Sequence, residues 1–191
     1  MKNEPKDLIA FVKTSLPDLE EMPSAEILKF ISLIKKPKGT KLFSEGKRHS
    51  NFYFIIKGTA KSYYLKDGKK VCLWFAFEND TLGSIMTYNG EPSNETIELL
   101  EDSELICYKS DPLKRLAKEN LAVSNLSYKM LEEHALFLEY RLQQLLFMSS
   151  KERYENLLKA APEVFQRVSL TDIASYLGVS RETLSRIRKQ G

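Results

Sequence analysis

The sequence predicts an α+β chain in which an antiparallel β-roll is followed by a long helix and a C-terminal helix-turn-helix. Short β-branched and aromatic runs separated by glycines extend from about residue 38 to 108. Many short strands at this spacing favour an antiparallel barrel or roll. Apolar residues then recur at helical spacing to about residue 148, and a glycine separates two short helical patterns near the C-terminus.

The composition excludes several classes of protein. The 191 residues are enough for one medium or two small domains, and 42% hydrophobic residues can support a core, which excludes disorder throughout. No apolar run approaches the length of about 18 residues that a transmembrane helix needs. The N-terminus lacks the apolar segment of a signal peptide. We therefore expect a cytoplasmic protein with no membrane partner.

The few cysteines and histidines argue against a metal site. Cys72 and Cys107 cannot form a disulfide framework or a four-ligand zinc site by themselves. Both fall in expected strands, where we interpret them as small core residues rather than thiol sensors. His49 lies in a polar loop and His134 in a helical segment, and we expect neither to bind haem. We predict no metal site and no cofactor.

The small net charge of +3 is unevenly distributed. Residues 150–191 contain eight basic and five acidic residues, so this segment alone accounts for the excess of the whole chain. A basic end on a neutral body suggests an anionic partner, although three charges by themselves are weak support.

Residues 5–36 have the spacing of amphipathic helices. Leu8, Val12 and Leu16 recur at helical intervals, and Ser24 can cap a second helix that continues through Ile34. Residues 37–39 contain a proline and a glycine, which we expect to end it.

Five strands are expected next, over residues 52–56, 59–65, 71–77, 96–100 and 104–108. Asp67 and Gly68 lie between the second and third of them, and Asp-Gly in this position is a strong hairpin signal. Trp74, Phe75 and Phe77 fall in the third strand, where we interpret them as packing residues rather than a ligand-binding box.

A long helical region is predicted after Asp111 and Pro112, to about Met148. Within it a heptad-like seam recurs at steps of four and three residues, formed by Leu131, Ala135, Leu138, Leu142 and Leu145. Two interpretations stay open, a helix packed on its own domain and a coiled-coil-like dimer helix. Two heptads are too few for periodicity to decide between them.

The C-terminal segment predicts a helix over residues 151–160 and then a helix-turn-helix. Ser169 and Asp172 have capping-box-like spacing, Gly178 can stop the first helix in a left-handed conformation, and Ser180 is a good N-cap for the second. The second helix would bury Leu184 and Ile187 and expose a polar, basic face.

That face has the chemistry to read DNA. A major groove admits an α-helix, an arginine can pair with guanine, and a glutamate can accept a hydrogen bond from cytosine. Helix N-termini and hydroxyls suit phosphate oxygens. The candidate contacts are Arg181, Glu182, Ser185, Arg186, Ser169, Ser180, Thr183 and Arg188. The alternative is a helical hairpin with a solvated basic face.

Gly-Val-Ser-Arg-Glu-Thr-Leu-Ser-Arg-Ile at residues 178–187 resembles the recognition helix of the Crp/Fnr family of bacterial transcription regulators. Residues 42–46, 52–58 and the hairpin at 67–68 resemble the N-terminal β-roll of that family, and residues 99–105 resemble the strand after its phosphate-binding cassette. Residues 150–154 and 173–178 are especially similar to Bacteroidetes members.

The resemblance implies a roll of the cyclic-nucleotide-binding type (a double-stranded β-helix or jelly roll with flanking helices), a long dimerisation helix and a winged helix-turn-helix. The corresponding domains would span residues 1–110, 111–148 and 149–191. It also implies a homodimer that binds double-stranded DNA at a pseudo-palindromic site and acts on RNA polymerase. Arg181, Glu182 and Arg186 match the base-reading positions of the cAMP-responsive activators, which suggests a TGTGA-like half-site.

The effector pocket departs from the family pattern. In the cAMP binders a Glu holds the ribose and an Arg holds the cyclic phosphate, but here Gly83 is followed by Ser84, and the Arg position falls at Ser93, beside Asn94. The helix positions that touch the base fall near Phe137 and Leu138, which are apolar. A buried phosphate without its charged partner loses a strong bond. We therefore expect no control by cAMP, and the roll is either a ligand-free scaffold or the site of an unknown small molecule.

Three further expectations complete the interpretation. No glycine-rich phosphate loop, nucleophile elbow or metal-ligand spacing is present, so we predict a protein that is not an enzyme. An alternative function is a small-molecule sensor module without direct DNA readout. Because the chain ends four residues after Ile187, any wing would come from residues 162–168.

Overall fold

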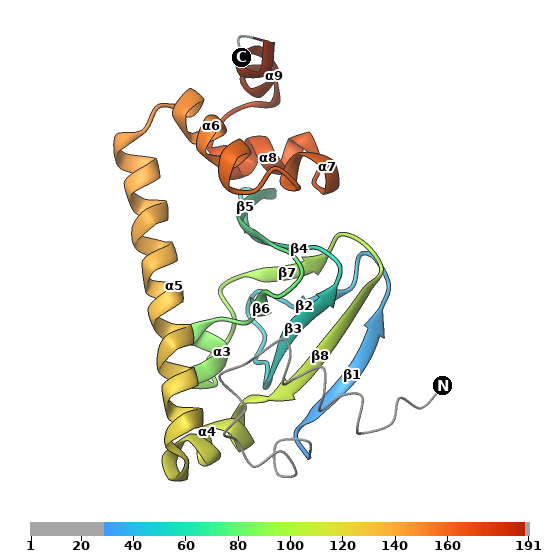
Figure 1. Ribbon diagram of the computed structural model, residues 1–191. Helices are drawn as coiled ribbons and strands as arrows, with labels where there is room; N and C mark the ends of the chain where they lie inside the picture. Colours follow the sequence, from blue (N-terminus) through green and yellow to red (C-terminus); the bar gives the residue numbers. More distant parts are fainter. Residues whose placement is uncertain (1–28, 190–191) are drawn as a thin grey trace.

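Two four-stranded antiparallel sheets form the lower half of the molecule in Figure 1. The computed structural model describes residues 29–189, apart from the side chain of Leu126. The first sheet has the order β1 (Ile31–Lys36), β8 (Ser103–Lys109), β3 (Asn51–Lys57) and β6 (Thr81–Leu82). The second has the order β2 (Lys41–Phe43), β7 (Thr96–Leu99), β4 (Ala60–Lys66) and β5 (Lys69–Ala76). We call residues 31–109 the roll.

The roll has a closely packed apolar core. Its members come from strands of both sheets, and six of them have no exposed surface, namely Phe43, Ile55, Leu82, Ile97, Leu99 and Leu105. Alternate residues of a strand point to opposite faces, so each strand contributes every second side chain to this core. The expected antiparallel roll is therefore confirmed.

The hairpin between β4 and β5 has the predicted turn. Asp67 and Gly68 have φ values of 51° and 75°, the pair of positive angles that a two-residue type I′ turn requires. The turn sets the register in which Lys66 pairs with Lys69, and both strands continue from there into the second sheet.

The helix expected over residues 5–36 is wrong at its C-terminal end, because residues 31–36 form strand β1. Ile31, Leu33 and Ile34 pair with Tyr108, Ile106 and Leu105 of β8. The isoleucines have helical spacing, but this segment forms a strand because β8 offers it backbone hydrogen bonds. Such pairing with a distant strand is not visible in the local pattern. Residues 1–28 lie outside the described part of the chain.

The helical region expected from residue 111 to 148 consists of two helices, because Asn120 interrupts it. The carboxamide of Asn120 accepts a hydrogen bond from the backbone of Val123 and so caps the second helix. Val123 is buried against Phe54 and Ile106, which fastens this end of the long helix to the first sheet. The described helices are α3 (Ile85–Asn89), α4 (Ser110–Glu119), α5 (Leu121–Phe147), α6 (Ser150–Ala160), α7 (Val164–Arg167), α8 (Leu170–Leu177) and α9 (Arg181–Lys189). None of them combines the length and apolar character needed to cross a membrane.

Residues 149–189, which we call the head, form a helical unit at the far end of α5 (Figure 1). Ile173, Leu177 and Leu184 are buried together with Val164. The expected wing at residues 162–168 is absent, since this segment is a turn followed by α7 and no strand lies within the head. Val164 and Val168 point into the head core, and a short helix buries both of them.

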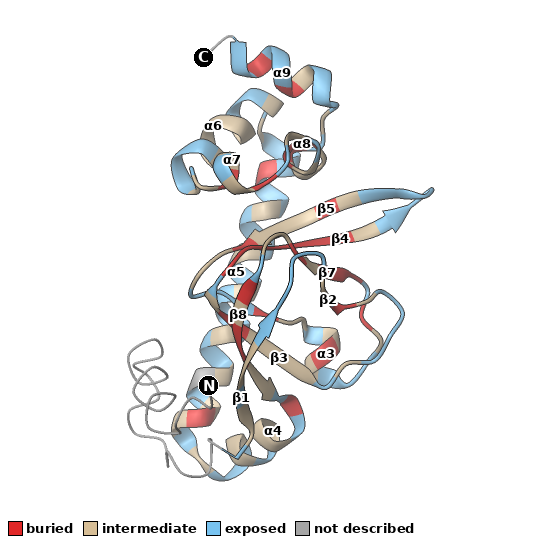
Figure 2. Ribbon diagram, turned by 90° about the vertical axis from the view of Figure 1, so that its right-hand side faces the viewer, coloured by how far each residue is buried: buried red, intermediate tan, exposed pale blue. Residues whose placement is uncertain are grey.

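The head covers the free edge of the second sheet. β5 is the outermost strand there, and α8 lies along it in both views (Figures 1 and 2). The hydroxyl of Ser175 accepts a hydrogen bond from the Cys72 amide (2.9 Å) and is 3.2 Å from the carbonyl of Lys70, to which it donates. Phe75 packs against Tyr176, with ring centroids 5.3 Å apart. An unpaired strand edge is thereby covered by a helix.

A buried ion pair joins the roll to the head beside this edge. Lys61 of β4 lies 2.8 Å from Asp172 of α8, and their side chains are only 8% and 17% exposed. Arg141 of α5 stacks on Tyr176, with its guanidinium 3.7 Å from the ring centroid, and donates to the carbonyl of the same residue. The head thus contacts both the roll and the long helix.

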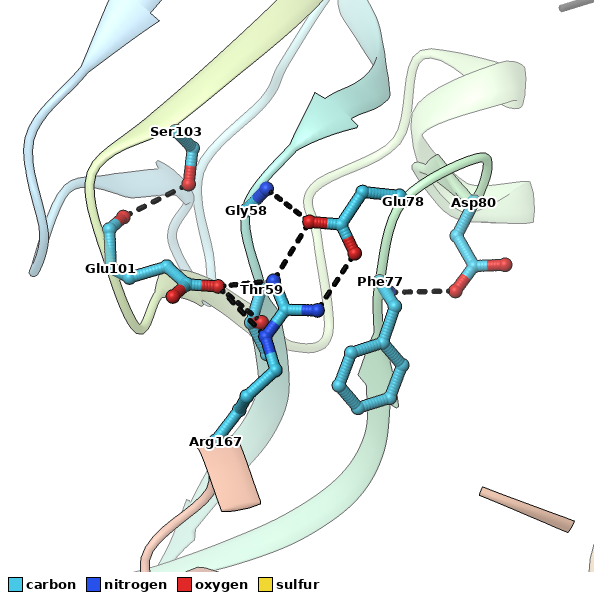
Figure 3. Close-up of polar contacts among 8 residues, drawn as sticks. All are labelled: Gly58, Thr59, Phe77, Glu78, Asp80, Glu101, Ser103 and Arg167. Carbon is cyan, nitrogen blue, oxygen red and sulfur yellow. Dashed lines mark hydrogen bonds and ion pairs between the residues drawn. The ribbon is translucent and has the colours of Figure 1, made fainter. Parts of the chain in front are cut away.

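A second ionic contact involves Arg167, Glu78 and Glu101, which we call the Arg167 cluster (Figure 3). Arg167 makes two hydrogen bonds to Glu78, of 2.7 and 2.8 Å, and also pairs with Glu101. Glu78 accepts from the Gly58 amide, and Glu101 accepts from the hydroxyl of Thr59. Both carboxylates are therefore positioned by hydrogen bonds within the roll, independently of the arginine of the head.

These contacts change the pKa values within the Arg167 cluster. The hydrogen bonds from Arg167 lower the pKa of Glu78 to about 2. Burial raises the pKa of Glu101, but hydrogen bonds from Thr59 and Arg167 outweigh burial and leave it lowered. The pKa of Arg167 is raised by its bonds to Glu78 and Glu101. All three groups are thus charged at neutral pH.

The cluster predicts a pH-dependent contribution to stability. The pKa of Glu78 is about 2 when folded and about 4.3 when unfolded. Its contribution is therefore complete above the unfolded value and is lost as the pH falls through the folded value. We expect Glu78→Gln to be less stable than the wild type at pH 7, with a difference in unfolding free energy that shrinks between about pH 4.3 and 2. Urea unfolding at fixed protein concentration over this pH range measures it.

Glu155→Gln is the matched control, since Glu155 makes only an exposed i,i+4 pair with Lys151 in α6. A difference between Glu78→Gln and the wild type that stays constant from pH 7 to pH 2.5 would contradict the prediction.

Candidate nucleic-acid interface

The two helices α8 and α9 have the capping predicted from the sequence. The hydroxyl of Ser169 accepts a hydrogen bond from the Asp172 amide at the start of α8. Gly178 ends this helix with a φ of 69°, in the left-handed region. Ser180 caps α9 by accepting from the amide of Thr183. The local sequence thus determines both helix ends and the turn between them.

Helix α9 separates its apolar side from its polar side. Leu184 and Ile187 are buried against the head, which leaves the opposite side of the helix free. Glu182, Ser185, Arg186 and Lys189 are exposed there, and Arg181 and Arg188 are exposed at the borders of the buried side. The exposed face therefore offers several cationic groups and one carboxylate, and its first turn holds both an arginine and the glutamate.

Hydrogen bonds organise the first turn of α9. Ser180 donates to the hydroxyl of Thr183, and Arg186 donates to the same hydroxyl at 3.2 Å. Both hydroxyls are thus already engaged in hydrogen bonds at the start of the helix, and Thr183 orients the guanidinium of Arg186. The pKa of Glu182 is lowered by its own backbone amide and by Ser180, so its carboxylate is charged and can accept hydrogen bonds.

Ser169 lies at the start of α8 rather than on the face of α9. Its hydroxyl donates to Asp172 at 2.7 Å, and the other carboxylate oxygen of Asp172 pairs with Lys61 of the roll. The described contacts place Ser169 beside the seam between head and roll, so the structure does not group it with the residues of α9.

Helix α5 exposes an apolar stripe along the predicted seam. Leu131, Leu138, Leu142 and Leu145 are 38–56% exposed, and Ala135 between them is exposed as well. Leu136, Leu146 and Phe147 widen the apolar surface, with exposures of 59–80%. The seam residues are therefore not packed against the rest of the same chain, as the first of the two interpretations would require.

The residues expected to line an effector pocket are engaged in contacts of the roll itself. A Cβ atom at Gly83 would lie 2.0 Å from the ring of Phe52, so the glycine leaves room for that ring. Ser84 caps α3 by accepting from the Thr87 amide. Ser93 is buried and donates to the carbonyl of Glu95.

The remaining three pocket candidates lie in the loop before β7 and on α5. Asn94 is exposed, and Leu138 is 52% exposed on α5. Phe137 of the same helix is half-buried. The described contacts do not bring the six candidates together.

Sequence reasoning missed a buried carboxylate in the roll. Glu95 is 6% exposed, and it accepts hydrogen bonds from Ser62 and from the indole of Trp74, the latter at 3.0 Å. Burial raises its pKa, and the two hydrogen bonds lower it by less. The signal in the sequence was an acidic residue directly before an apolar strand.

Other side chains singled out in the sequence have structural roles. Trp74 packs on the roll core, whereas Phe75 and Phe77 pack against the head. Cys72 is buried, and burial raises its pKa to about 12, which makes its thiol a poor nucleophile. Cys107 is half-buried in β8.

Comparison with known proteins supports the architecture. Residues 33–120 match a family model described as the cyclic nucleotide-binding domain, which corresponds to the roll with α3 and α4. No curated protein matches the chain in sequence.

Solved structures resemble the whole described arrangement. FixK2 from Bradyrhizobium japonicum is 21% identical with a TM-score of 0.74, over 84% of this chain and 83% of that one. CLP, a c-di-GMP-responsive global regulator from Xanthomonas campestris, is 20% identical with a TM-score of 0.68, over 87% and 88%.

A candidate transcriptional regulator of the Crp/Fnr family from Eubacterium rectale is also similar. It is 20% identical with a TM-score of 0.69, over 91% of this chain and 84% of that one. The chain therefore has the fold of Crp/Fnr-type regulators, with a domain of the cyclic nucleotide-binding type over residues 33–120.

Proposed function

We propose that the chain is a sequence-specific DNA-binding transcription regulator of the Crp/Fnr type and not an enzyme. It binds a pseudo-palindromic promoter site as a homodimer, inserts α9 into the major groove, and acts on RNA polymerase. The observation that supports this best is α9 itself, whose exposed face combines Arg181, Glu182 and Arg186 while its other side is buried in the head.

The electrostatics of the head suit this role. The head contains eight basic and five acidic residues, and a dimer would present two such heads to one DNA duplex. Asp172 is compensated by Lys61 of the roll, whereas Arg167 is itself paired with Glu78 and Glu101. The positive charge available to phosphates is therefore that of α9, where Arg181, Arg186, Arg188 and Lys189 are exposed.

Arg186→Ala tests the base contact. Arg186 is exposed and bonded only to Thr183 in the structure, so its loss leaves the helix intact. A bidentate arginine–guanine pair is worth about 1–3 kcal/mol. We expect affinity for the selected site to fall at least about tenfold and selectivity for one guanine to relax. Site selection from random DNA followed by titration of the selected duplex measures both.

Lys159→Ala on α6 is the charge-matched control, because it removes one exposed positive charge of the head away from α9. It should lower affinity slightly and equally for all sequences. Unchanged affinity and selectivity of Arg186→Ala would contradict the assignment. A wild-type protein that binds a small molecule but no specific DNA would support the sensor-module alternative.

The apolar stripe of α5 supports the homodimer. Leucines at steps of three and four along one exposed face are the pattern of a two-helix seam, and a second copy of α5 would cover them. A palindromic site requires this two-fold arrangement.

Leu142→Glu tests the dimer. Leu142 is 56% exposed in the single chain, so the substitution leaves the monomer fold intact but buries a charge in the seam. We expect sedimentation equilibrium to show monomers at micromolar concentration and DNA affinity to fall by more than tenfold. Gln143→Glu introduces the same charge at the neighbouring exposed position, outside the seam. Dimers of equal strength for the two variants would contradict the proposal.

We further propose that cAMP is not the effector. Ser84 and Ser93 stand where the cAMP binders have Glu and Arg, and their hydroxyls already bond to Thr87 and Glu95. The buried carboxylate of Glu95 adds a group that opposes a buried phosphate. Without a cationic partner, the cyclic phosphate has no compensation for its lost hydration.

The expected result is that cAMP at up to about 1 mM gives no saturable heat in titration calorimetry and changes DNA affinity by less than twofold. Saturable binding to this chain, or a tenfold gain in DNA affinity with cAMP, would overturn the expectation.

A further inference from the structure

The head is held on its own roll at three places that do not lie on one line. Two of them are on α8, where Asp172 pairs with Lys61 and Ser175 bonds to β5. Since residues three apart lie on the same side of a helix, these two polar contacts lie along α8 and restrain rotation about that helix axis only weakly. Tyr176 adds ring contacts with Phe75 of the roll and Arg141 of α5, which are less directional than an ion pair bonded through two nitrogens. The third contact comes from Arg167 on α7, away from this axis.

Rotation of the head matters because of how it is joined to the dimer helix. Only Met148 and Ser149 separate α5 from α6. Arg153 braces this joint by donating to the carbonyls of Met148 and Leu177. The connection fixes where the head begins, whereas the seam with the roll determines which way α9 points.

From this arrangement we propose that Arg167 is a positioning residue for DNA binding. Its ion pairs with Glu78 and Glu101 fix the rotation of each head on its roll, and they thereby set the one spacing between the two recognition helices of the dimer. The proposal rests on the proposed function of a homodimer that reads two half-sites.

The chemistry of the Arg167 cluster suits such a constraint. A guanidinium bonded through two nitrogens to one carboxylate has a defined plane, which a lysine ammonium cannot provide. Glu78 and Glu101 follow β5 and β7, and they are oriented by Gly58 and Thr59 of the roll. Figure 3 shows the guanidinium between the two carboxylates, with Phe77 beside it. Its centre lies 5.3 Å from the Phe77 ring, so the plane is limited on a third side.

Half-site spacing is a sensitive readout of this geometry. Each base pair added between half-sites shifts one of them by about 3.4 Å and rotates it by about 34–36°. A dimer with rigid heads therefore tolerates one spacer length, whereas heads that rotate can follow neighbouring lengths. Recognition within each half-site depends on α9 and stays the same.

The experiment compares the full-length wild type with Arg167→Gln. Duplexes carry the selected half-site with spacers from two base pairs shorter to two longer than the selected one. We expect the wild type to bind the selected spacer at least about tenfold more tightly than its neighbours. In Arg167→Gln this preference should fall below about threefold, while discrimination against a mutated half-site is unchanged.

Three variants separate positioning from loss of charge or of folding. Glu78→Gln with Glu101→Gln removes the same contact from the roll and should broaden spacing equally. Arg167→Glu with Glu78→Arg restores an ion pair and should recover most of the preference. Lys151→Gln removes one exposed charge of the head without touching the roll and should behave as the wild type.

Hydrogen exchange measures the stability of the contact between head and roll in the absence of DNA. The amides of Gly58 and Cys72 bond to Glu78 and Ser175, so peptides that cover residues 56–60 and 69–77 should exchange at least about threefold faster in Arg167→Gln than in Lys151→Gln. An unchanged spacing preference in Arg167→Gln would overturn the proposal whatever the exchange rates. Absence of specific DNA binding by the wild type would overturn the proposed function and the spacing role with it. Faster exchange would then show a contact that is only structural.

Discussion

The outer edge of strand β5, which has no neighbouring strand, is the constraint on which the arrangement of the molecule depends. A sheet that ends in an unpaired strand exposes backbone donors and acceptors, and here helix α8 covers them. The head shares an apolar core with Phe75, Phe77 and Leu100 of the roll as a result. The head is therefore part of the packing of the body and not a separate domain on a flexible linker.

This packing explains where the charged groups at the seam lie. The side chains of Lys61 and Asp172 are mostly buried and satisfy one another, since an unpaired charge at that place would be costly. The Arg167 cluster is about one-third exposed, so its contribution to stability is modest and depends on salt. The mostly buried Lys61–Asp172 pair stabilises the contact between head and roll. The partly exposed pairs of Arg167 with Glu78 and Glu101 orient the head on the roll.

Much of the fold could be predicted because it depends on local pattern. Asp67 and Gly68 specify a hairpin wherever they occur between two β-like runs, and the observed angles agree. Ser169, Gly178 and Ser180 cap the helices that their chemistry favours. Strand β1 and the helical form of residues 162–168 could not be predicted in this way. Both depend on distant partners, namely the edge of β8 and the core of the head.

The candidate interface likewise has one part that local pattern predicts and another that depends on distant residues. The exposed polar face of α9 follows from periodicity, because burial of Leu184 and Ile187 leaves Arg181 and Arg186 in solvent. The role of Arg167 does not, since its partners lie 89 and 66 residues away in the sequence. The same distance hides the contacts of Glu95 with Ser62 and Trp74.

By itself, the sequence determined the class of fold, the caps of α8 and α9 and the side of α9 that meets solvent. These follow from residues within one or two turns of one another, where capping, turn geometry and amphipathic spacing act. Only the tertiary structure decided that the head rests on β5 and which charges hold it there. Contacts between distant segments arise from the shared burial of surfaces, and no local pattern in the chain encodes their pairing.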